Sequence, residues 1–373
     1  MKLTIERSAL LKTLGHVQSV VERRNTIPIL SNVMLTADGG RLRLTATDLD
    51  IQIVDSTDAI IDIPGDTTVP AQTLMDIVRK LPEGSQVQLE KQSDGRLRVV
   101  AGRSRFQMPV LPSDDFPNIS RGQMEHSFTL PINSLREALE RTRFAMSTEE
   151  TRYYLNGIFM HVVSSDDAPG GELIVAATDG HRLARSKVNS GEAAIAGMPD
   201  VIIPRKAVGE VMKLMSEYDG EVEISVSKTK IGFDIGHLSL TTKAIDGTFP
   251  DYSRVIPQGN KILVKANVKE LAEVVDRVTV IATEKTRAVR MRVEDAAIKL
   301  SVTSPESGTS AEELACEENG SIDIGFNARY LTEMLKYIGS EEVELRFGDS
   351  ASPVLITDLN RPEDKNVIMP MRV

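Results

Sequence analysis

The sequence predicts an α+β protein built from three copies of one domain, and three observations lead to this prediction. Residues 41–53 and 172–184 share one pattern: a strand-like run, then Ala-Thr-Asp, then a second strand-like run. Aligning Asp48 with Asp179 separates the two segments by 131 residues, and a chain of 373 residues has room for three such repeats. Four landmarks also recur in the same order three times, which is typical of repeated domains.

The first landmark is a strand that leads into a helix. It begins at Leu3 (LTIERSALLKTL), at Phe128 (FTLPINSLREAL) and, less clearly, at Ile262 (ILVKANVKELAEVV). In the second copy Asn133 is a candidate N-cap, because its side chain can accept a backbone N–H of the first helical turn. Apolar residues follow at helical spacing, which predicts one buried stripe on the helix.

The second landmark is a pair of strands, found in residues 27–48, 152–179 and 288–304. Asp38-Gly39-Gly40 and Glu294-Asp295 stand where two of these pairs need a tight hairpin turn. Tight hairpin turns favour Asp, Asn and Gly, since these residues tolerate a positive φ. We therefore expect antiparallel hairpins at both places.

The third and fourth landmarks complete each repeat. A strand end, a helix and another strand occupy residues 67–90, 201–226 and 322–347, with Pro70, Pro204 and Asn327 at the helix starts. Proline suits a helix start because the first N–H groups have no partner within the helix. A terminal hairpin follows, and its Phe116-Pro117 and Phe249-Pro250 match at an offset of 133 residues.

Each repeat therefore contains two helices and about eight short strands, and we expect a β-sheet with the helices on one face. Polar joints containing Gly or Pro predict three domains, at residues 1–125, 126–257 and 258–373. The alternative is one large β-rich enzyme of 373 residues.

Composition limits the class of protein. Hydrophobic residues make up 41% of the chain and charged residues 26%, as in globular proteins. Cys316 is the single cysteine, so the chain can form no internal disulfide, and a reducing, cytoplasmic location is expected. The first residues predict a strand and a helix rather than a signal peptide, and no apolar run is long enough to suggest a membrane partner.

The sequence offers little catalytic chemistry. It has five histidines and no HExxH, CxxC, P-loop, GxGxxG or GxSxG pattern. Asp48 and Asp50 could ligate a metal, and His181 beside Asp179 could form an acid/base pair, but both sets also suit polar turns. Cys316 lies in the acidic segment AEELACEENG, which disfavours a thiolate. We expect no catalytic residue, no metal and no cofactor.

Charge is unevenly distributed. The net charge is −10, which argues against tight binding of DNA by broad electrostatic attraction. The six expected helices, at residues 7–24, 71–81, 133–145, 205–217, 267–281 and 327–338, nevertheless carry a net +6, and the rest of the chain carries −16. If the helices share one face, that face is mildly basic. A closed ring would keep DNA by topology and would need only such weak contacts.

The motifs together identify a family. The segments RNTIPILSN, GRSRF, RYYLNG, ATDGHRLA, DGTFPDYSRV and VIMPMRV run through the whole length of the chain. On these segments the chain resembles the bacterial sliding clamps, the beta subunits of DNA polymerase III. The resemblance implies a head-to-tail homodimeric ring of three clamp domains per chain, with helices lining the hole. It implies a processivity factor, not an enzyme, that encircles double-stranded DNA without sequence preference.

The resemblance also implies partners and sites. The partners are the clamp loader, the catalytic subunit of the replicative polymerase, translesion polymerases and mismatch-repair proteins, which all dock short peptides in one pocket. The pocket residues carried over by motif are Leu155, Thr178, Gly180, His181, Arg182, Leu183, Pro250, Arg254, Val255, Asn327, Tyr330, Val367, Met369, Pro370, Met371 and Arg372.

Two smaller sets follow from the same resemblance. The DNA contacts are Arg24, Tyr153, Tyr154 and Arg205, and the dimer interface contains Phe106 and Met108 from one chain and Val280 and Ile281 from the other. The chain departs from the family pattern at Glu149, where a glutamine that contacts DNA can occur, and at Pro353, where a small polar residue is frequent.

Two other functions remain open at this point. One is a hydrolytic enzyme on a repeated β-rich scaffold, and the other is a protein scaffold that binds peptides but never encloses DNA. Retention on circular compared with linear DNA distinguishes both from a ring.

Overall fold

The structure is a computed structural model that describes residues 1–22, 26–165, 168–191, 193–282 and 288–373. It divides into two compact units: unit 1 contains residues 1–133 and 191–244, and unit 2 contains residues 134–190 and 245–373. The described residues form six α-helices and 26 strands, in agreement with two helices and about eight strands per repeat. No described helix is long and apolar enough to cross a membrane.

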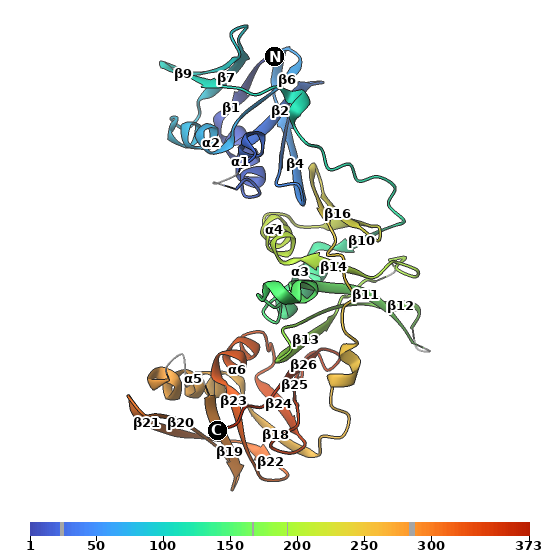
Figure 1. Ribbon diagram of the computed structural model, residues 1–373, viewed down its shortest axis with the longest axis vertical. Coiled ribbons are helices and arrows are strands. Elements are labelled where there is room, and N and C mark those ends of the chain that lie inside the picture. Colours follow the sequence, from blue (N-terminus) through green and yellow to red (C-terminus); the bar gives the residue numbers. More distant parts are fainter. Residues whose placement is uncertain (23–25, 166–167, 192, 283–287) are drawn as a thin grey trace. The chain divides into compact units, whose positions relative to one another are not determined.

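Unit 1 holds three helices: α1 (Arg7–Gln18), α2 (Ala71–Lys80) and α4 (Arg205–Met215). A five-stranded sheet has the order β5-β1-β7-β8-β9, and an eight-stranded sheet has the order β10-β15-β16-β17-β4-β3-β2-β6. Helices α1 and α2 lie side by side and pack on these strands (Figure 1). The strands of unit 1 are β1 (Lys2–Glu6), β2 (Asn32–Asp38), β3 (Arg41–Thr47), β4 (Ile51–Asp58), β5 (Ile60–Ile63), β6 (Gly65–Pro70), β7 (Gln86–Lys91), β8 (Arg96–Ala101), β9 (Ser104–Pro109), β10 (His126–Pro131), β14 (Val201–Pro204), β15 (Glu221–Val226), β16 (Lys230–Ile235) and β17 (Leu238–Lys243).

Unit 2 holds most of α3 (Ile132–Arg143), with α5 (Val268–Val278) and α6 (Ala328–Leu335). The strands of unit 2 in its larger sheet have the order β11-β12-β13-β26-β25-β24-β18-β22, and a four-stranded sheet has the order β21-β20-β19-β23. Short 3-10 helices η3 (Glu150–Leu155), η4 (Tyr252–Val255) and η5 (Thr279–Ile281) connect these elements. The strands are β11 (Gly157–Ser165), β12 (Ala168–Thr178), β13 (Arg182–Lys187), β18 (Ile262–Asn267), β19 (Ala288–Glu294), β20 (Ala297–Ser304), β21 (Gly308–Ala315), β22 (Glu317–Glu318), β23 (Ile322–Asn327), β24 (Glu342–Phe347), β25 (Val354–Asp358) and β26 (Lys365–Ile368).

Each unit joins two consecutive repeats through a continuous sheet. In unit 1, β17 of the second repeat pairs with β4 of the first, with Leu240 opposite Ile53. In unit 2, β13 of the second repeat pairs with β26 of the third, with Leu183 opposite Val367. The second repeat therefore contributes strands to both units. The predicted domain bounds are a division by sequence repeat, and they stay a prediction.

The helix starts confirm part of the sequence interpretation. Pro70, Pro204 and Asn327 are the N-cap residues of α2, α4 and α6, so the three positions are equivalent as expected. Asn133 is not an N-cap, because α3 already begins at Ile132. The helix expected over residues 7–24 ends at Gln18, where a hydrogen-bonded turn at Val20 and Val21 follows.

Both predicted hairpin turns are present. Gly39 and Gly40 connect β2 to β3 with φ values of 57° and 77°. Asp295 and Ala296 connect β19 to β20 with φ values of 54° and 56°. Two consecutive residues with positive φ make the twist of the turn match that of the strands.

Candidate peptide-binding site

The repeated Ala-Thr-Asp segment forms the same hydrogen-bonded turn in both copies. In unit 2, Thr178 Oγ1 donates to the Arg182 carbonyl at 2.7 Å, and Asp179 Oδ1 accepts the backbone N–H groups of His181 and Arg182 at 2.9 and 3.0 Å. Gly180 has a φ of 87°, which suits glycine. The turn ends β12 and reverses the chain into β13.

The first copy has an identical pattern. Thr47 Oγ1 donates to the Ile51 carbonyl at 2.8 Å, and Asp48 Oδ1 accepts the N–H groups of Asp50 and Ile51 at 3.0 and 2.8 Å. The position equivalent to Gly180 is Leu49, which adopts a φ of 79°. The repeat at 131 residues is therefore real at the level of single hydrogen bonds.

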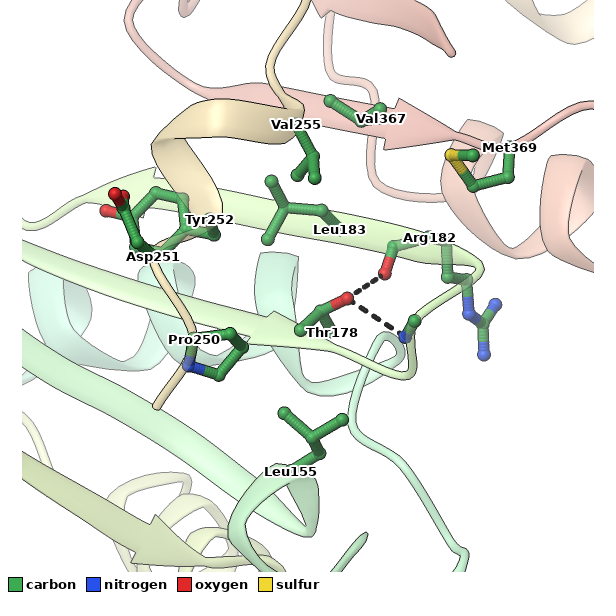
Figure 2. A pocket seen from close by; sticks show the side chains of 11 residues that line it. Leu155, Thr178, Arg182, Leu183, Pro250, Asp251, Tyr252, Val255, Val367 and Met369 are labelled. Atoms are coloured by element: carbon green, nitrogen blue, oxygen red, sulfur yellow. Dashed lines mark hydrogen bonds between the residues drawn. The ribbon is translucent and has the colours of Figure 1, made fainter. Parts of the chain in front are cut away.

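Beside the turn of unit 2 lies an apolar pocket of about 200 Å³. Leu183 and Val367 form its floor as cross-strand partners and pack with Leu355. In Figure 2, Leu183, Val255 and Val367 point toward one another, while Leu155 and Pro250 lie beside Thr178. The residues that line the pocket are Leu155, Thr178, Gly180, Arg182, Leu183, Pro250, Asp251, Tyr252, Val255, Val367 and Met369. These residues come from η3, the 178–183 turn, η4 and the end of β26, which are far apart in sequence.

The Arg182 guanidinium is directed away from the pocket centre (Figure 2). It pairs with Asp179 at 3.0 Å and with Glu333 of α6 at 2.5 Å, and it donates to the Phe144 carbonyl at 2.5 Å. Its Cζ atom lies 4.2 Å from the centre of the Tyr330 ring. Since the residue is only 7% exposed, the guanidinium fixes the turn against α6 rather than facing solvent.

Aromatic rings support the wall that η4 provides. The Tyr252 hydroxyl and His161 Nε2 share a hydrogen bond at 3.0 Å, and the His161 ring stacks on Phe159 with a centroid distance of 4.3 Å. Phe159 stacks in turn on Phe249 at 4.8 Å. Burial, and then the nearby Arg185 charge, lower the pKa of His161 to about 4. His161 is therefore neutral at pH 7.

The structure brings together nine of the sixteen residues expected in the pocket. These are Leu155, Thr178, Gly180, Arg182, Leu183, Pro250, Val255, Val367 and Met369. The other seven lie outside the lining. His181 accepts at its carbonyl from Met369, Arg254 pairs with Asp251, and Asn327 caps α6. Tyr330 stacks on Arg182, as described above.

The remaining three expected residues belong to the chain end. Met371 donates its N–H to the Gly325 carbonyl, while Pro370 and Arg372 flank it on an exposed or half-buried stretch. Pro353 is also outside the lining, and its carbonyl accepts from Asn260. Asp251 and Tyr252 line the pocket but were not expected. They lie within the FPDYSRV motif, next to the expected Pro250.

Sequence profiles of the DNA polymerase III beta subunit match the chain in three consecutive parts. The N-terminal domain matches residues 1–120, the central domain 129–251 and the C-terminal domain 253–372. The chain belongs to the DNA polymerase III beta subunit family. The sliding-clamp function predicted from the motifs is confirmed, as are three clamp domains of mixed α+β structure.

Individual relatives agree over their full length. The beta sliding clamp of Caulobacter vibrioides is 50% identical, and that of Escherichia coli is 36% identical, with 100% of both chains covered in each case. Among solved structures, the C. crescentus beta sliding clamp has a TM-score of 0.97 at 49% identity, covering 100% of this chain and 99% of that one. The Bartonella birtlesii clamp, bound to griselimycin, has a TM-score of 0.96 at 45% identity, with 100% of both chains covered.

Of the candidate DNA contacts that the structure describes, Tyr153 and Arg205 are exposed and Tyr154 is half-buried. Tyr153 of η3 is 54% exposed and meets Tyr154 edge to face, and Arg205 is the exposed first residue of α4. Arg24 lies outside the described residues. Glu149 precedes η3 and lies 3.4 Å from Arg152, so its carboxylate has a positive neighbour.

Positive charge gathers on the helices of unit 1. Helices α1, α2 and α4 contain seven Lys and Arg against two Asp and Glu, a net +5. Helices α3, α5 and α6 contain six of each kind and are neutral. The net charge of the six helices is therefore positive, as expected, but it comes from α1, α2 and α4.

The candidate interface residues lie on or beside two strands that end their sheets, β9 and β21. Phe106, on the edge strand β9, is 37% exposed, and Val280, in η5 next to the edge strand β21, is 80% exposed. Ile281 is half-buried against the core of the third repeat. Met108 is only 3% exposed within the single chain, so its side chain has little surface left for a partner.

The side chains considered for metal binding or acid/base chemistry have other roles in the structure. No metal-binding group of three or more His, Cys, Asp or Glu exists among the residues that the structure describes. Both oxygens of Asp179 serve the turn and Arg182. Burial, and then Glu318, raise the pKa of the Cys316 thiol.

Proposed function

We propose that two copies of this chain close head to tail into a ring around duplex DNA. The ring would tether partner proteins through the apolar pocket of unit 2 and would catalyse no reaction. The observation that carries the tethering role is this pocket, in which segments separated by up to about 200 residues meet around Leu183. Family membership supports DNA and the polymerase as partners and the cytoplasm as the location.

The pocket suits one part of an extended peptide. Its volume of about 200 Å³ is smaller than the roughly 300–1,000 Å³ of sites for drug-sized ligands. Leu155, Leu183, Val255, Val367 and Met369 provide apolar walls, and methionine adapts to varied shapes. We infer that the ligands are segments carrying glutamine, leucine and phenylalanine. The clamp loader, the replicative and translesion polymerases and mismatch-repair proteins would compete for this pocket.

The open edges support the dimer. Strand β9 ends the five-stranded sheet of unit 1, and β21 ends the four-stranded sheet of unit 2. An exposed edge with apolar side chains is a template for pairing with another chain. Because each chain supplies one edge of each kind, a head-to-tail contact repeated twice would close a ring and cover both.

A peptide titration tests the pocket. Deleting residues 369–373 removes the Met369 wall, and burial of one large apolar side chain is worth roughly 1.5–3 kcal/mol. Since about 1.4 kcal/mol is tenfold in affinity, we expect micromolar binding of a labelled peptide of this type to be lost. The dimer should survive, because the tail is not at the proposed interface.

Two point variants make the test specific. Val255→Glu places a charge at an exposed position of the pocket wall and should weaken the peptide by at least tenfold. Ile60→Glu is the matched control, because Ile60 is an exposed apolar residue on β5 in unit 1. Binding within threefold of wild type by the truncated, folded dimer, or equal losses in the two point variants, would show that the pocket is elsewhere.

A further inference from the structure

The last residues of the chain are held by two backbone hydrogen bonds, and the second of these lies outside the pocket. After β26, the Met369 N–H donates to the His181 carbonyl at 2.8 Å. Two residues later, the Met371 N–H donates to the Gly325 carbonyl, also at 2.8 Å, and the two residues form an antiparallel bridge. Pro370, which has no N–H, lies between the two hydrogen bonds. The tail is thus fixed on both sides of Pro370.

Gly325 lies on the open edge of a sheet. It belongs to β23, the last strand in the order β21-β20-β19-β23, and pairs with Arg290 of β19 on its other side. The tail therefore occupies the free edge of β23 at Gly325. The pocket lining ends at Met369, so Gly325 itself is not part of it.

A side chain at position 325 would collide with the tail. A Cβ atom built on Gly325 would lie 2.6 Å from the Met371 carbonyl oxygen and 2.3 Å from Val373 Cγ1. Gly325 is not among the residues with positive φ, so alanine is compatible with its backbone. Glycine inside a strand weakens the strand, and it often marks a place where another backbone approaches closely. Here the approaching backbone is that of the tail.

We propose that Gly325 is a docking notch for the C-terminal tail and thereby positions Met369 at the mouth of the pocket. The inference rests on the proposed peptide-binding function. Docking places Met369 before a ligand arrives, so binding need not order it. If release of the tail from Gly325 left Met369 in its pocket position in only about a tenth of the molecules, the apparent affinity for the peptide would fall about tenfold. Gly325 acts through the tail and is a positioning residue.

The first arm of the test measures the tail without any ligand. Gly325→Ala should abolish protection of the Met371 amide against hydrogen exchange. Gly259→Ala is the matched control, because an added Cβ there has no atom within 4 Å and Gly259 also has no positive φ. Protection that persists in folded Gly325→Ala overturns the notch.

The second arm measures peptide affinity in a double-mutant cycle. Gly325→Ala and a chain ending at Pro370 should each lower the affinity for the labelled peptide about tenfold. Combining the two changes should cause no further loss. A further loss in the double variant, or unchanged affinity in Gly325→Ala despite lost protection, contradicts positioning through the tail. Met371→Pro removes the Met371 N–H that donates to Gly325, and Met371 is exposed. This variant should lower the peptide affinity to the same extent without altering β23.

The two arms separate this inference from the function on which it rests. If wild type binds no such peptide, the proposed function fails, while the exchange measurement still decides whether Gly325 docks the tail.

Discussion

Two buried histidines differ in the sign of their pKa shift, and this difference has a measurable consequence. Burial lowers the pKa of His16, but Asp55 at 2.6 Å and Glu217 at 3.0 Å outweigh it and raise the pKa above 6.5. The charged form is thus stabilised by folding. Its contribution to the free energy of unfolding is complete below pH 6.5 and is lost as the pH rises through the folded-state pKa.

We therefore expect the cost of His16→Gln to depend on pH. Urea denaturation should show a larger loss of stability at pH 6 than at pH 9, because wild type itself loses the His16 contribution at high pH. The cluster also includes His237, 3.3 Å from Asp55 and more exposed, so His237→Gln serves as a control with a smaller effect. Equal losses for His16→Gln at both pH values would contradict the assignment.

The pKa shift of His161 has the opposite sign. Its pKa is lowered to about 4, so between pH 6.5 and 4 the unfolded chain binds a proton that the folded chain does not. Stability then falls as the pH falls through this range. His161→Phe should reduce this dependence on acid, and it should also release Tyr252 from its hydrogen bond.

Residue identity in the pocket was partly predictable. Leu183 and Val255 were predicted only through the resemblance of their motifs to those of the sliding clamps, because the local sequence by itself indicates no more than a turn. Arg182 was expected in the pocket and does line it, but its guanidinium binds Asp179, Glu333 and the Phe144 carbonyl instead of facing the cavity. Two of these partners lie far away in the chain, and no local pattern indicates them.

At the scale of elements, the backbone of the β19–β20 turn is strained. Asp295 and Ala296 both have positive φ, and Ala296 is exposed. A left-handed conformation costs a non-glycine residue roughly 1–2 kcal/mol, while Asp tolerates it better than Ala. Ala296→Gly should therefore raise the free energy of unfolding of unit 2 by about 1 kcal/mol, measured by urea denaturation.

Asp295→Gly is the matched control, because it changes the neighbouring residue in the same turn. It should stabilise less than Ala296→Gly. A destabilised Ala296→Gly variant would show that the turn does not hold this strain.

The helices also show what a repeat can predict. His16 of α1 and Arg141 of α3 are equivalent positions in the first landmark, 125 residues apart. His16 reaches Glu217 of the second repeat, and Arg141 reaches Asp358 and the Tyr337 carbonyl of the third. The repeat predicts equal positions in the fold. It could not predict the partners, because these come from the next repeat along the chain.

At the scale of the whole molecule, the order of elements was readable from the sequence and the distribution of charge was not. The expected net +6 on six helices becomes +5 with the observed bounds, and all of it lies on α1, α2 and α4. The predicted helix over residues 7–24 included Arg23 and Arg24, which lie outside the described residues, whereas α1 ends at Gln18. Weak contacts of this size suit a protein held on DNA by topology.

Retention on circular DNA tests the central claim most directly. The protein is loaded by a clamp loader onto nicked circular duplex, washed in high salt, and the circle is then cut once. Phe106→Glu combined with Val280→Glu is the control, because both side chains are exposed and the double variant should give folded monomers that are never retained. We expect wild type to stay on the circle through the wash and to leave once the DNA is linear. Retention that is equal on circular and linear DNA would contradict the ring.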